Sequence, residues 1–405
     1  MKKTMPTASL FLSALLTVAG CGPGSDGQTE NRWVSAAAPP AVRLAGALTR
    51  GAFSVGFRKE TLHLADAAEG QPSSLDLYLW FPAAEPDRAA EAAEPLVFAD
   101  YYRAQEADEP DREALREWLR GDMTSPPGLD IATIDAVLDA PMWARDRAEP
   151  VRGRHPLVLW SYRDGVPTMQ AGLNEYLASH GYVVAFAWPV EHAPPFPWQE
   201  GLTGGDKSSA LETQVNLLES VLDSMLSRAW IDDDRVAVLS WSYGGESAGG
   251  LQRRRAEVGL VLGIDSTLAS GWVYKTADDL ASLDRRSLSV PYVLLRNGRP
   301  RIGGDRSLEP TLLAEVPAGA WYVEFSELSH GNFNFPGGMI PGVLGLDEVS
   351  RWAVGGEVAR LGYELICRHV LGFLDLHQRQ EHLDPRVWSA SAPEGFVEVQ
   401  RHPPQ

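Results

Sequence analysis

The clearest chemical pattern in the sequence surrounds Ser242. Residues 240–245 are Ser-Trp-Ser-Tyr-Gly-Gly, and they directly follow an apolar run at 235–239. A serine with small residues two positions before and after it, where a strand turns into a helix, is typical of a nucleophile elbow, usually Gly-x-Ser-x-Gly. Ser240 replaces the first glycine but is also small. We therefore expect Ser242 to attack an acyl carbon, with the backbone N–H of Tyr243 as one oxyanion donor. The alternative is a serine that only caps the following helix.

His330 has the place along the chain that a partner base requires. In the strand–turn–helix arrangement around such a serine, the acid and then the histidine follow the nucleophile. His330 lies in a loop directly after the apolar run at 321–325. The remaining downstream histidines lie within a helical pattern or toward the C-terminal segment: His369, His377, His382 and His402. We therefore predict that His330 takes and returns the proton.

Two aspartates compete for the role of the acid that orients His330. Asp265 directly follows the apolar run at 258–264, whereas Asp305 is the first carboxylate after the run at 291–295. The carboxyl ends of parallel strands are where ligands and functional groups gather in open sheets. We favour Asp265 because a strand end positions a side chain better than a glycine-containing loop does. Asp305 remains the alternative acid, and a helix cap remains the alternative role of Asp265.

The segments around these residues indicate a sheet that is buried on both faces. Short apolar runs lie at 157–160, 182–188, 235–239, 258–264, 291–295 and 321–325, with helical patterns at about 211–225 and 357–376. Continuous apolar strands that alternate with amphipathic helices are typical of parallel sheets covered on both sides. We predict an α/β fold with a doubly wound, mostly parallel sheet and helices on both faces. An earlier, alternating strand is expected at 75–81, ending at Pro82.

Composition limits the classes of function. The 405 residues are 44% hydrophobic and 22% charged, with a formal net charge of −18. Such a chain is globular, and its acidity disfavours nucleic-acid binding, which needs a basic surface. The cysteines, Cys21 and Cys367, are too few for a disulfide framework. Cys367 lies in an apolar helical pattern and is expected to be buried and inert.

The N-terminal segment resembles a bacterial lipoprotein signal. Lys2 and Lys3 precede an apolar stretch at 8–19 that is too short to span a bilayer, and small residues lead to Cys21. The resemblance implies cleavage before Cys21 and lipidation of its thiol. Gly22 is not the aspartate that retains such proteins at the inner membrane, which favours the outer membrane of the bacterial cell envelope. The alternative is an ordinary secretory signal with a chance cysteine.

The composition changes along the chain, and these changes predict the domain organisation. We expect a signal peptide at 1–20, a flexible tether at 21–45, the catalytic domain at 46–380 and a polar tail at 381–405. An acidic, proline-rich insertion is expected at about 100–150, before the strand at 157–160, with helical patches at 111–119 and 131–138.

Taken together, the chain resembles the plasma-type platelet-activating-factor acetylhydrolases, a branch close to the dienelactone-hydrolase-like esterases. The resemblance covers about residues 75–375. It rests on Leu79-Trp80-Phe81-Pro82, on Val190-Glu191-His192, on the spacing of Asp265 after Ser242, and on His330-Gly331-Asn332-Phe333. It implies the α/β-hydrolase fold and a Ser242, Asp265 and His330 triad. It also implies a serine esterase without metal or cofactor that releases short or oxidised acyl chains from phospholipids.

One segment departs from the family pattern. The family has Ser-His-Gly-x-Gly after its third core strand, where a second oxyanion N–H arises, and this chain has Ser161-Tyr162-Arg163-Asp164-Gly165. The resemblance assigns the donor to the backbone of Arg163, and the charged replacement leaves the substrate class open. Aromatic residues available for a substrate rim are Tyr162, Trp188, Phe196, Trp198 and Trp241. Glu191 and His192 lack a second histidine at ligand spacing, so no metal site is predicted.

The residues therefore predict a serine hydrolase that cleaves carboxylic esters, with a small ester or lipid as substrate and a membrane anchor at Cys21. Two other functions stay open. One is a catalytically silent binding lipoprotein that retains the fold, and the other is hydrolysis of amide, polyester or polysaccharide ester bonds. A fold alone does not choose among these.

Overall fold

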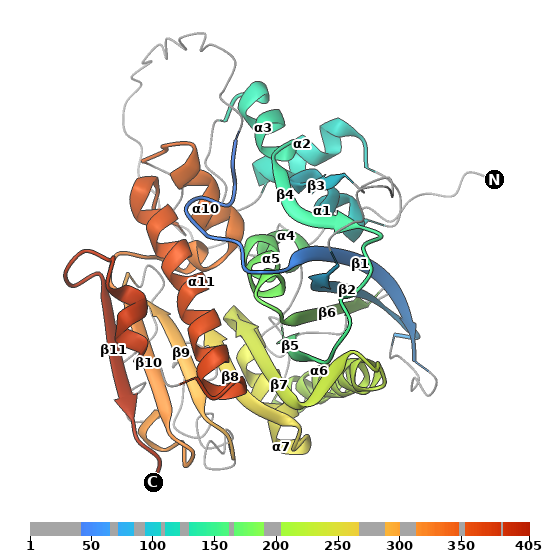
Figure 1. The fold of residues 1–405 in the computed structure, drawn as a ribbon, viewed down its shortest axis with the longest axis vertical. Coiled ribbons are helices and arrows are strands. Elements are labelled where there is room, and N and C mark those ends of the chain that lie inside the picture. The colour runs from blue at the N-terminus through green and yellow to red at the C-terminus, as the bar shows by residue number, and fades with distance from the viewer. Residues whose placement is uncertain are drawn as a thin grey trace. The chain divides into compact units, whose positions relative to one another are not determined.

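One mixed sheet runs through the described part of the chain (Figure 1). This computed structural model describes residues 42–64, 72–84, 94–106, 110–121, 129–161, 166–189, 204–266, 288–299, 313–347, 353–381 and 384–405. They belong to one compact unit, Pro39–Gln405. Within them the sheet has 11 strands, in the order β11-β10-β9-β8-β7-β5-β6-β2-β1-β4-β3.

The bounds of the elements are as follows. The strands are β1 Ser54–His63, β2 Ser74–Ala83, β3 Pro95–Val97, β4 Pro141–Asp146, β5 His155–Ser161, β6 Val183–Pro189, β7 Ile231–Trp241, β8 Val258–Ile264, β9 Tyr292–Asn297, β10 Ala320–Phe325 and β11 Val397–His402. The helices are α1 Phe98–Gln105, α2 Arg112–Gly121, α3 Ile131–Leu138, α4 Val166–Met169, α5 Ala171–Ser179, α6 Gly204–Leu226, α7 Gly245–Arg254, α10 Phe335–Val343 and α11 Gly356–Gln378. Short 3₁₀ segments are η2 Ser242–Gly244, η4 His330–Phe333 and η5 Pro385–Ser389.

The centre of the sheet is parallel. Neighbouring strands from β6 through β5, β7, β8 and β9 to β10 all pair in parallel. Every apolar run predicted as a strand after residue 156 overlaps one of these strands. The predicted doubly wound, mostly parallel sheet is therefore confirmed. On one side β2 and β1 continue it as antiparallel strands, and β4 then pairs in parallel with β1.

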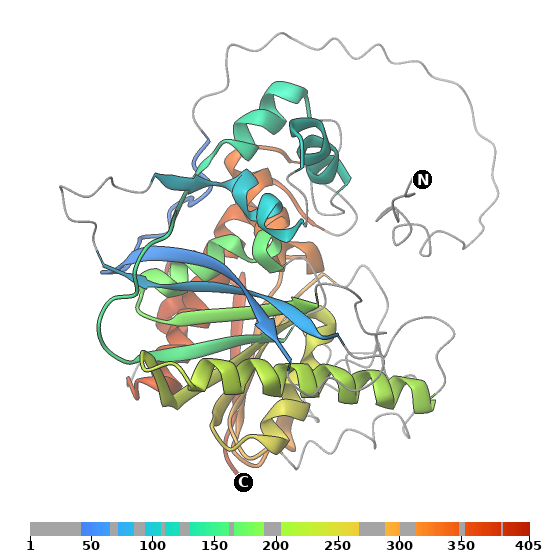
Figure 2. The same ribbon diagram turned by 90° about the vertical axis from the view of Figure 1, so that its right-hand side faces the viewer.

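The alternation of side chains along the strands explains why they are apolar throughout. Val158 and Trp160 of β5 belong to one hydrophobic core, whereas Leu157 and Leu159 belong to another. Helices α5 and α11 contribute to the first core and α6 and α7 to the second, on opposite faces of the sheet (Figure 2). Because both faces are covered, a polar residue in these strands would be buried, so the strands read as continuous apolar runs.

The early strand extends further than expected. The prediction ended it at Pro82, but β2 continues through Pro82 to Ala83. The ladder between β2 and β6 ends at Trp80, so the missing N–H of Pro82 removes no hydrogen bond from it. The carbonyl of Pro82 still accepts a hydrogen bond from the Val151 N–H, 2.9 Å away.

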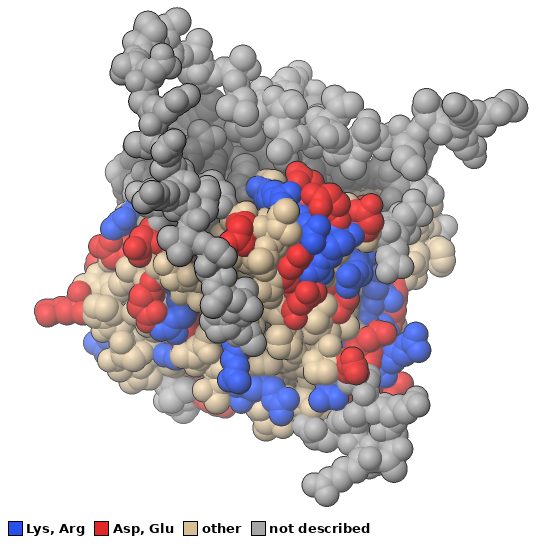
Figure 3. Space-filling model, turned by 90° about the horizontal axis from the view of Figure 1, so that it is seen from above, with Lys and Arg blue, Asp and Glu red and all other residues tan. Residues whose placement is uncertain are grey.

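The predicted helical patches of the insertion are α2 and α3. Arg112 and Arg116 of α2 both bind Asp135 of α3, at 2.9 Å and 2.7 Å. Among the described residues coloured in Figure 3, acidic and basic side chains lie interspersed. Segments β3 and β4, which the sequence did not predict as strands, join this region to the main sheet.

A buried carboxylate attaches the insertion to the rest of the fold. Glu175 of α5 accepts hydrogen bonds from the Tyr101 hydroxyl at 2.6 Å and from the backbone N–H groups of Trp143 and Ala144 at 2.8 Å and 2.9 Å. Burial raises the pKa of Glu175 to about 7, although the three donors oppose that shift. The same side chain therefore holds both α1 and β4.

The C-terminal segment is not only a polar tail. Residues 397–402 form β11, which pairs antiparallel with β10 at the edge of the sheet. Val397 and Val399 pack against the core while the intervening Glu398 is exposed. The prediction missed this strand because an edge strand needs apolar residues on one face only, and charged residues fill the other.

Cys367 lies in α11, in the apolar pattern that predicted its burial. Cys367 is fully buried, and burial raises the pKa of its thiol well above the usual range, as expected of an inert cysteine. Among the residues that the structure describes, no helix combines the length and apolar character needed to cross a bilayer.

Candidate active site

The chain turns from β7 into α7 at Ser242. Strand β7 ends at Trp241, η2 occupies Ser242–Gly244, and α7 begins at Gly245. The backbone of Ser242 has φ 50°, in the left-handed region that is unfavourable for a residue with a side chain. Such a strained turn presents the serine hydroxyl at the carboxyl edge of the sheet. Tyr243 lies in the 3₁₀ turn, so its backbone N–H is among those at the helix start that have no intrahelical acceptor.

Buried serines fasten the elbow to the neighbouring strands. Ser240, which replaces the usual glycine, donates a hydrogen bond to the Ser266 hydroxyl at 3.1 Å. Ser161, the last residue of β5, donates to the Gly244 carbonyl at 2.7 Å and lies 2.8 Å from the Ser247 hydroxyl. The strand that leads into the segment with Arg163 is therefore held directly to the turn with Ser242.

His330 lies between Ser242 and Asp265. Its Nε2 is 3.1 Å from Ser242 Oγ, and its Nδ1 is 2.5 Å from Asp265 Oδ2. Ser242 follows β7, Asp265 follows β8, and His330 begins η4 after β10, so the three residues are far apart in the sequence. These contacts give the geometry of a nucleophile, a base and an orienting carboxylate.

Asp265 is held by β9 as well as by His330. Arg296 Nη1 donates to Oδ1 at 2.6 Å, and Asn297 donates its side-chain amide to Oδ2 and its backbone N–H to Oδ1 at 3.3 Å. Burial by itself raises the pKa of the Asp265 carboxyl. The Arg296 charge and the His330 hydrogen bond outweigh that effect and hold the pKa well below its usual range. Asp265 is therefore a carboxylate, as an orienting acid must be.

Asp265, like Ser242, has a strained backbone conformation. Its backbone has φ 45°, again in the left-handed region, and its N–H donates to the Leu295 carbonyl at 2.7 Å. The hydrogen bond extends the β8–β9 ladder by one residue while the backbone turns. Strain of this kind is retained where the surrounding structure determines the conformation, and it concentrates at functional sites.

Asn332 fixes the loop that holds His330. Its side-chain oxygen accepts from the N–H groups of Ser329 and Val354, each at 3.0 Å, and its amide donates to the carbonyls of Gly337 and Val354, each at 2.9 Å. The side chain is completely buried, with its polar groups satisfied. Asn332 belongs to the motif quoted for the family resemblance, and the structure gives it a positioning role.

Trp241 covers one face of the His330 ring. The two rings are nearly parallel, with an interplanar angle of 10° and centroids 4.7 Å apart. From the sequence, Trp241 was predicted only as one of the aromatic residues available for a substrate rim. Stacking on the imidazole restricts rotation of the ring and excludes water from that face.

Several predicted residues lie outside the described residues. They are Cys21, Tyr162, Arg163, Asp164, Gly165, Val190, Glu191, His192, Phe196, Trp198 and Asp305. Two assignments therefore stay predictions: Arg163 as the second oxyanion donor and Asp305 as the alternative acid. Trp188 is described, and its ring stacks on Phe186 at 6.4 Å within β6.

The roles of Arg296 and Asn297 were not predicted from the sequence. Both residues lie at the end of a predicted strand, where only a carboxylate was considered as a functional group. An arginine and an asparagine that end a buried apolar strand need polar partners, and this was the available signal.

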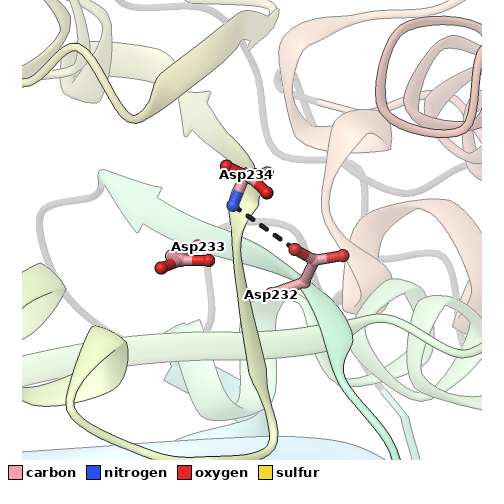
Figure 4. Close-up of side chains that lie close together, drawn as sticks. All are labelled: Asp232, Asp233 and Asp234. Carbon is pink, nitrogen blue, oxygen red and sulfur yellow. Dashed lines mark hydrogen bonds between the residues drawn. The ribbon is translucent and has the colours of Figure 1, made fainter.

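An acidic cluster lies at the opposite end of β7 from Ser242. Asp232, Asp233 and Asp234 bring carboxylate oxygens within 4.8 Å of one another (Figure 4). Arg235 lies 3.4 Å from Asp232, and Arg154 contacts Asp233. The cluster is on the surface, is compensated by arginines, and takes no part in the site around Ser242.

Comparisons with known proteins define the fold class. A scan of family models and a search of curated proteins found no match. A search of solved structures found a ferulic acid esterase from Streptomyces cinnamoneus, with a TM-score of 0.59 and 21% sequence identity. The match covers 89% of this chain and 100% of that chain. The protein has the α/β-hydrolase fold, as the sequence predicted.

Proposed function

We propose that the protein is a serine hydrolase that cleaves carboxylic esters through an acyl-enzyme. The observation that carries the proposal is the pair of contacts made by His330, 3.1 Å to Ser242 Oγ and 2.5 Å to Asp265 Oδ2. The strained turn at Ser242 and the ionised state of Asp265 support it. The structural likeness to an esterase supports the fold on which this chemistry is common, and the activity itself remains our proposal.

The geometry supports a two-step mechanism. His330 Nε2 accepts the proton of Ser242 Oγ as the oxygen attacks the ester carbonyl carbon, and Asp265 stabilises the imidazolium. The backbone N–H of Tyr243, and in our prediction that of Arg163, bind the oxyanion. The tetrahedral intermediate expels the alcohol, which takes the proton from His330. A water molecule then attacks the acyl-enzyme and gives a proton to His330. As the second tetrahedral intermediate collapses and releases the acid, His330 returns that proton to Ser242 Oγ.

For the substrate, we propose esters with short or oxidised acyl chains, phospholipids included. The support is the resemblance of His330-Gly331-Asn332-Phe333 and of the Ser242 to Asp265 spacing to the platelet-activating-factor acetylhydrolases. The name of the structural neighbour adds ferulate esters to the compounds worth testing. The rim residues that would choose among them lie mainly outside the described residues.

A fluorophosphonate probe and an ester panel test the proposal together. We expect the probe to label Ser242, because the residue is activated by His330, and we expect turnover of p-nitrophenyl acetate and butyrate. The panel continues with longer p-nitrophenyl esters, an oxidised phosphatidylcholine and methyl ferulate. A folded protein that neither reacts with the probe nor hydrolyses any ester would instead be a binding lipoprotein that retains the fold.

We further propose that Cys21 is lipidated and holds the protein at the outer membrane of a bacterial envelope. The expected result is that Cys21→Ser moves the protein from the membrane fraction to the soluble fraction and abolishes palmitate incorporation. A lipobox product has several acyl chains, and one chain alone binds membranes only marginally. The matched control is Cys367→Ala, which removes the buried cysteine and should leave fractionation unchanged. Sedimentation of Cys21→Ser with membranes would contradict the proposal.

A further inference from the structure

Arg296 and His330 bind the two oxygens of the same carboxylate. Arg296 Nη1 lies 2.6 Å from Asp265 Oδ1, and His330 Nδ1 lies 2.5 Å from Asp265 Oδ2. The side chains of Arg296 and Asp265 are only 10% and 1% exposed, whereas that of His330 is 29% exposed. Water therefore screens the charge of Arg296 poorly, and this charge acts on both Asp265 and His330.

The guanidinium has two opposite electrostatic effects on the site. It stabilises the Asp265 carboxylate, which burial alone would favour as the neutral acid. It also disfavours a positive charge on the imidazole, because it neutralises part of the carboxylate charge that would stabilise an imidazolium. A histidine base works only while it is neutral in the free enzyme. A charge that disfavours the imidazolium therefore keeps the base competent at lower pH.

We propose that Arg296 is a positioning residue that fixes Asp265 for His330 and, through its charge, extends the working range of the site toward acidic pH. The proposal rests on the proposed function and goes beyond it. Backbone geometry supports the role, because Arg296 and Asp265 lie at the adjacent ends of β9 and β8, and the Asp265 N–H donates to Leu295. The ion pair thereby ties the acid to a strand that does not otherwise contribute to the three-residue set.

Other charged groups lie near Arg296 and Asp265 and make contacts of their own. On β10, Glu324 lies beside Arg296 in the ladder and accepts a hydrogen bond from the Tyr322 hydroxyl at 2.7 Å. Beyond the strand ends, Arg299 binds Glu327, and both side chains are about half exposed. Further charged residues on the elements packed against this region are Glu246 at the start of α7, and Glu357, Arg360 and Glu364 on α11, where Arg360 binds both glutamates.

The test is the pH dependence of kcat/KM for a p-nitrophenyl ester. In Arg296→Met, which removes the charge at similar volume, we expect the acid limb of the profile to move upward by about one pH unit. Arg296→Gln removes the charge but keeps a donor, and its acid limb should move in the same direction. Arg296→Lys retains the charge, so its acid limb should stay close to that of the wild type, even if kcat falls because the shape of the guanidinium group and its hydrogen-bond direction are lost.

The matched control is Arg299→Met, which removes a positive charge from the exposed pair with Glu327. Solvent screens the pair of Arg299 with Glu327, so the acid limb of Arg299→Met should coincide with that of the wild type. Thermal unfolding of each variant shows which proteins are folded at the assay temperature. If a neutral variant is folded and only its kcat changes, Arg296 has a structural role alone and the proposal is overturned. If the neutral variants do not fold, the Arg296→Lys profile is compared with that of the wild type. A shift of its acid limb by a full pH unit overturns the proposal, because lysine retains the charge.

The outcome is distinguishable from failure of the proposed function. If the wild-type protein hydrolyses no ester and reacts with no fluorophosphonate, the esterase assignment fails before Arg296 is tested. If the wild type is active and the profiles of Arg296→Met and Arg296→Lys coincide, only the inference about Arg296 fails.

Discussion

Replacement of Ser242 by alanine should abolish ester turnover and leave the protein folded. Only the hydroxyl oxygen of Ser242 lies within reach of His330 Nε2, at 3.1 Å, so no other described group can form the acyl-enzyme in this geometry. In a serine protease triad, removal of the nucleophile costs about 10⁶ in kcat. Alanine has nearly the same backbone preferences as serine, so the strain at φ 50° is retained without a new penalty. The measurement is kcat with a p-nitrophenyl ester together with fluorophosphonate labelling.

The control for this experiment is another serine-to-alanine change. Ser220 is on α6, and its hydroxyl bonds only to the Asn216 carbonyl of its own helix, at 3.0 Å. Ser220→Ala should keep full activity and full labelling. If Ser242→Ala retained a tenth of the wild-type activity, Ser242 would not be the nucleophile, and a helix-capping role would be the better account.

The change Asp265→Asn should cost about 10⁴ in kcat, the loss found when the acid of a protease triad is replaced by its amide. The amide cannot stabilise the imidazolium, and its NH₂ group favours the tautomer with the proton on the wrong ring nitrogen. Asp305→Asn should have little effect if Asp265 is the acid. The measurement is kcat of both variants on the same ester, which compares the two acids that the sequence left open.

Stability needs a separate control in this comparison. Asp265 is the partner of the buried Arg296, so Asp265→Asn leaves a buried charge without its counter-ion. Breaking a buried ion pair costs about 3–5 kcal/mol of unfolding free energy. Activity is therefore measured at a temperature at which thermal unfolding shows the variant to be folded. A crippled Asp305→Asn together with a nearly normal Asp265→Asn would identify Asp305 as the acid and weaken the family resemblance.

The central sheet was predictable because burial imposes a strong requirement on it. Strands that are covered on both faces, such as β5 and β8, contain little except apolar residues, which makes them easy to recognise in the sequence. The contact between Ser242 and His330 was predictable because the types and chain order of these residues follow a known arrangement. For Asp265 the sequence favoured one of two candidates, and the structure brings that one into contact with His330.

What the sequence did not reveal depends on contacts between distant segments. In β11 and in the second half of β1 the exposed residues are polar or charged, so the apolar content of these segments does not distinguish them from loops. The ion pair of Arg296 with Asp265 and the stacking of Trp241 on His330 join residues from different strands. Pairing and register determine such contacts, and a single sequence carries little information about either.

The strand at the C-terminus has a practical consequence for producing this protein. Residues 381–405 have the composition of a dispensable extension, and a shortened gene for crystallisation or industrial use would end before them. Without β11, the hydrogen-bonding groups along Ala320–Phe325 would face water as an aromatic-rich sheet edge, a template for aggregation. The ring of Trp321, now covered by the Arg401 guanidinium 5.2 Å from its centroid, would also be exposed. Expression yield and solubility should therefore be judged on the chain that ends at Gln405, with any purification tag placed beyond that residue.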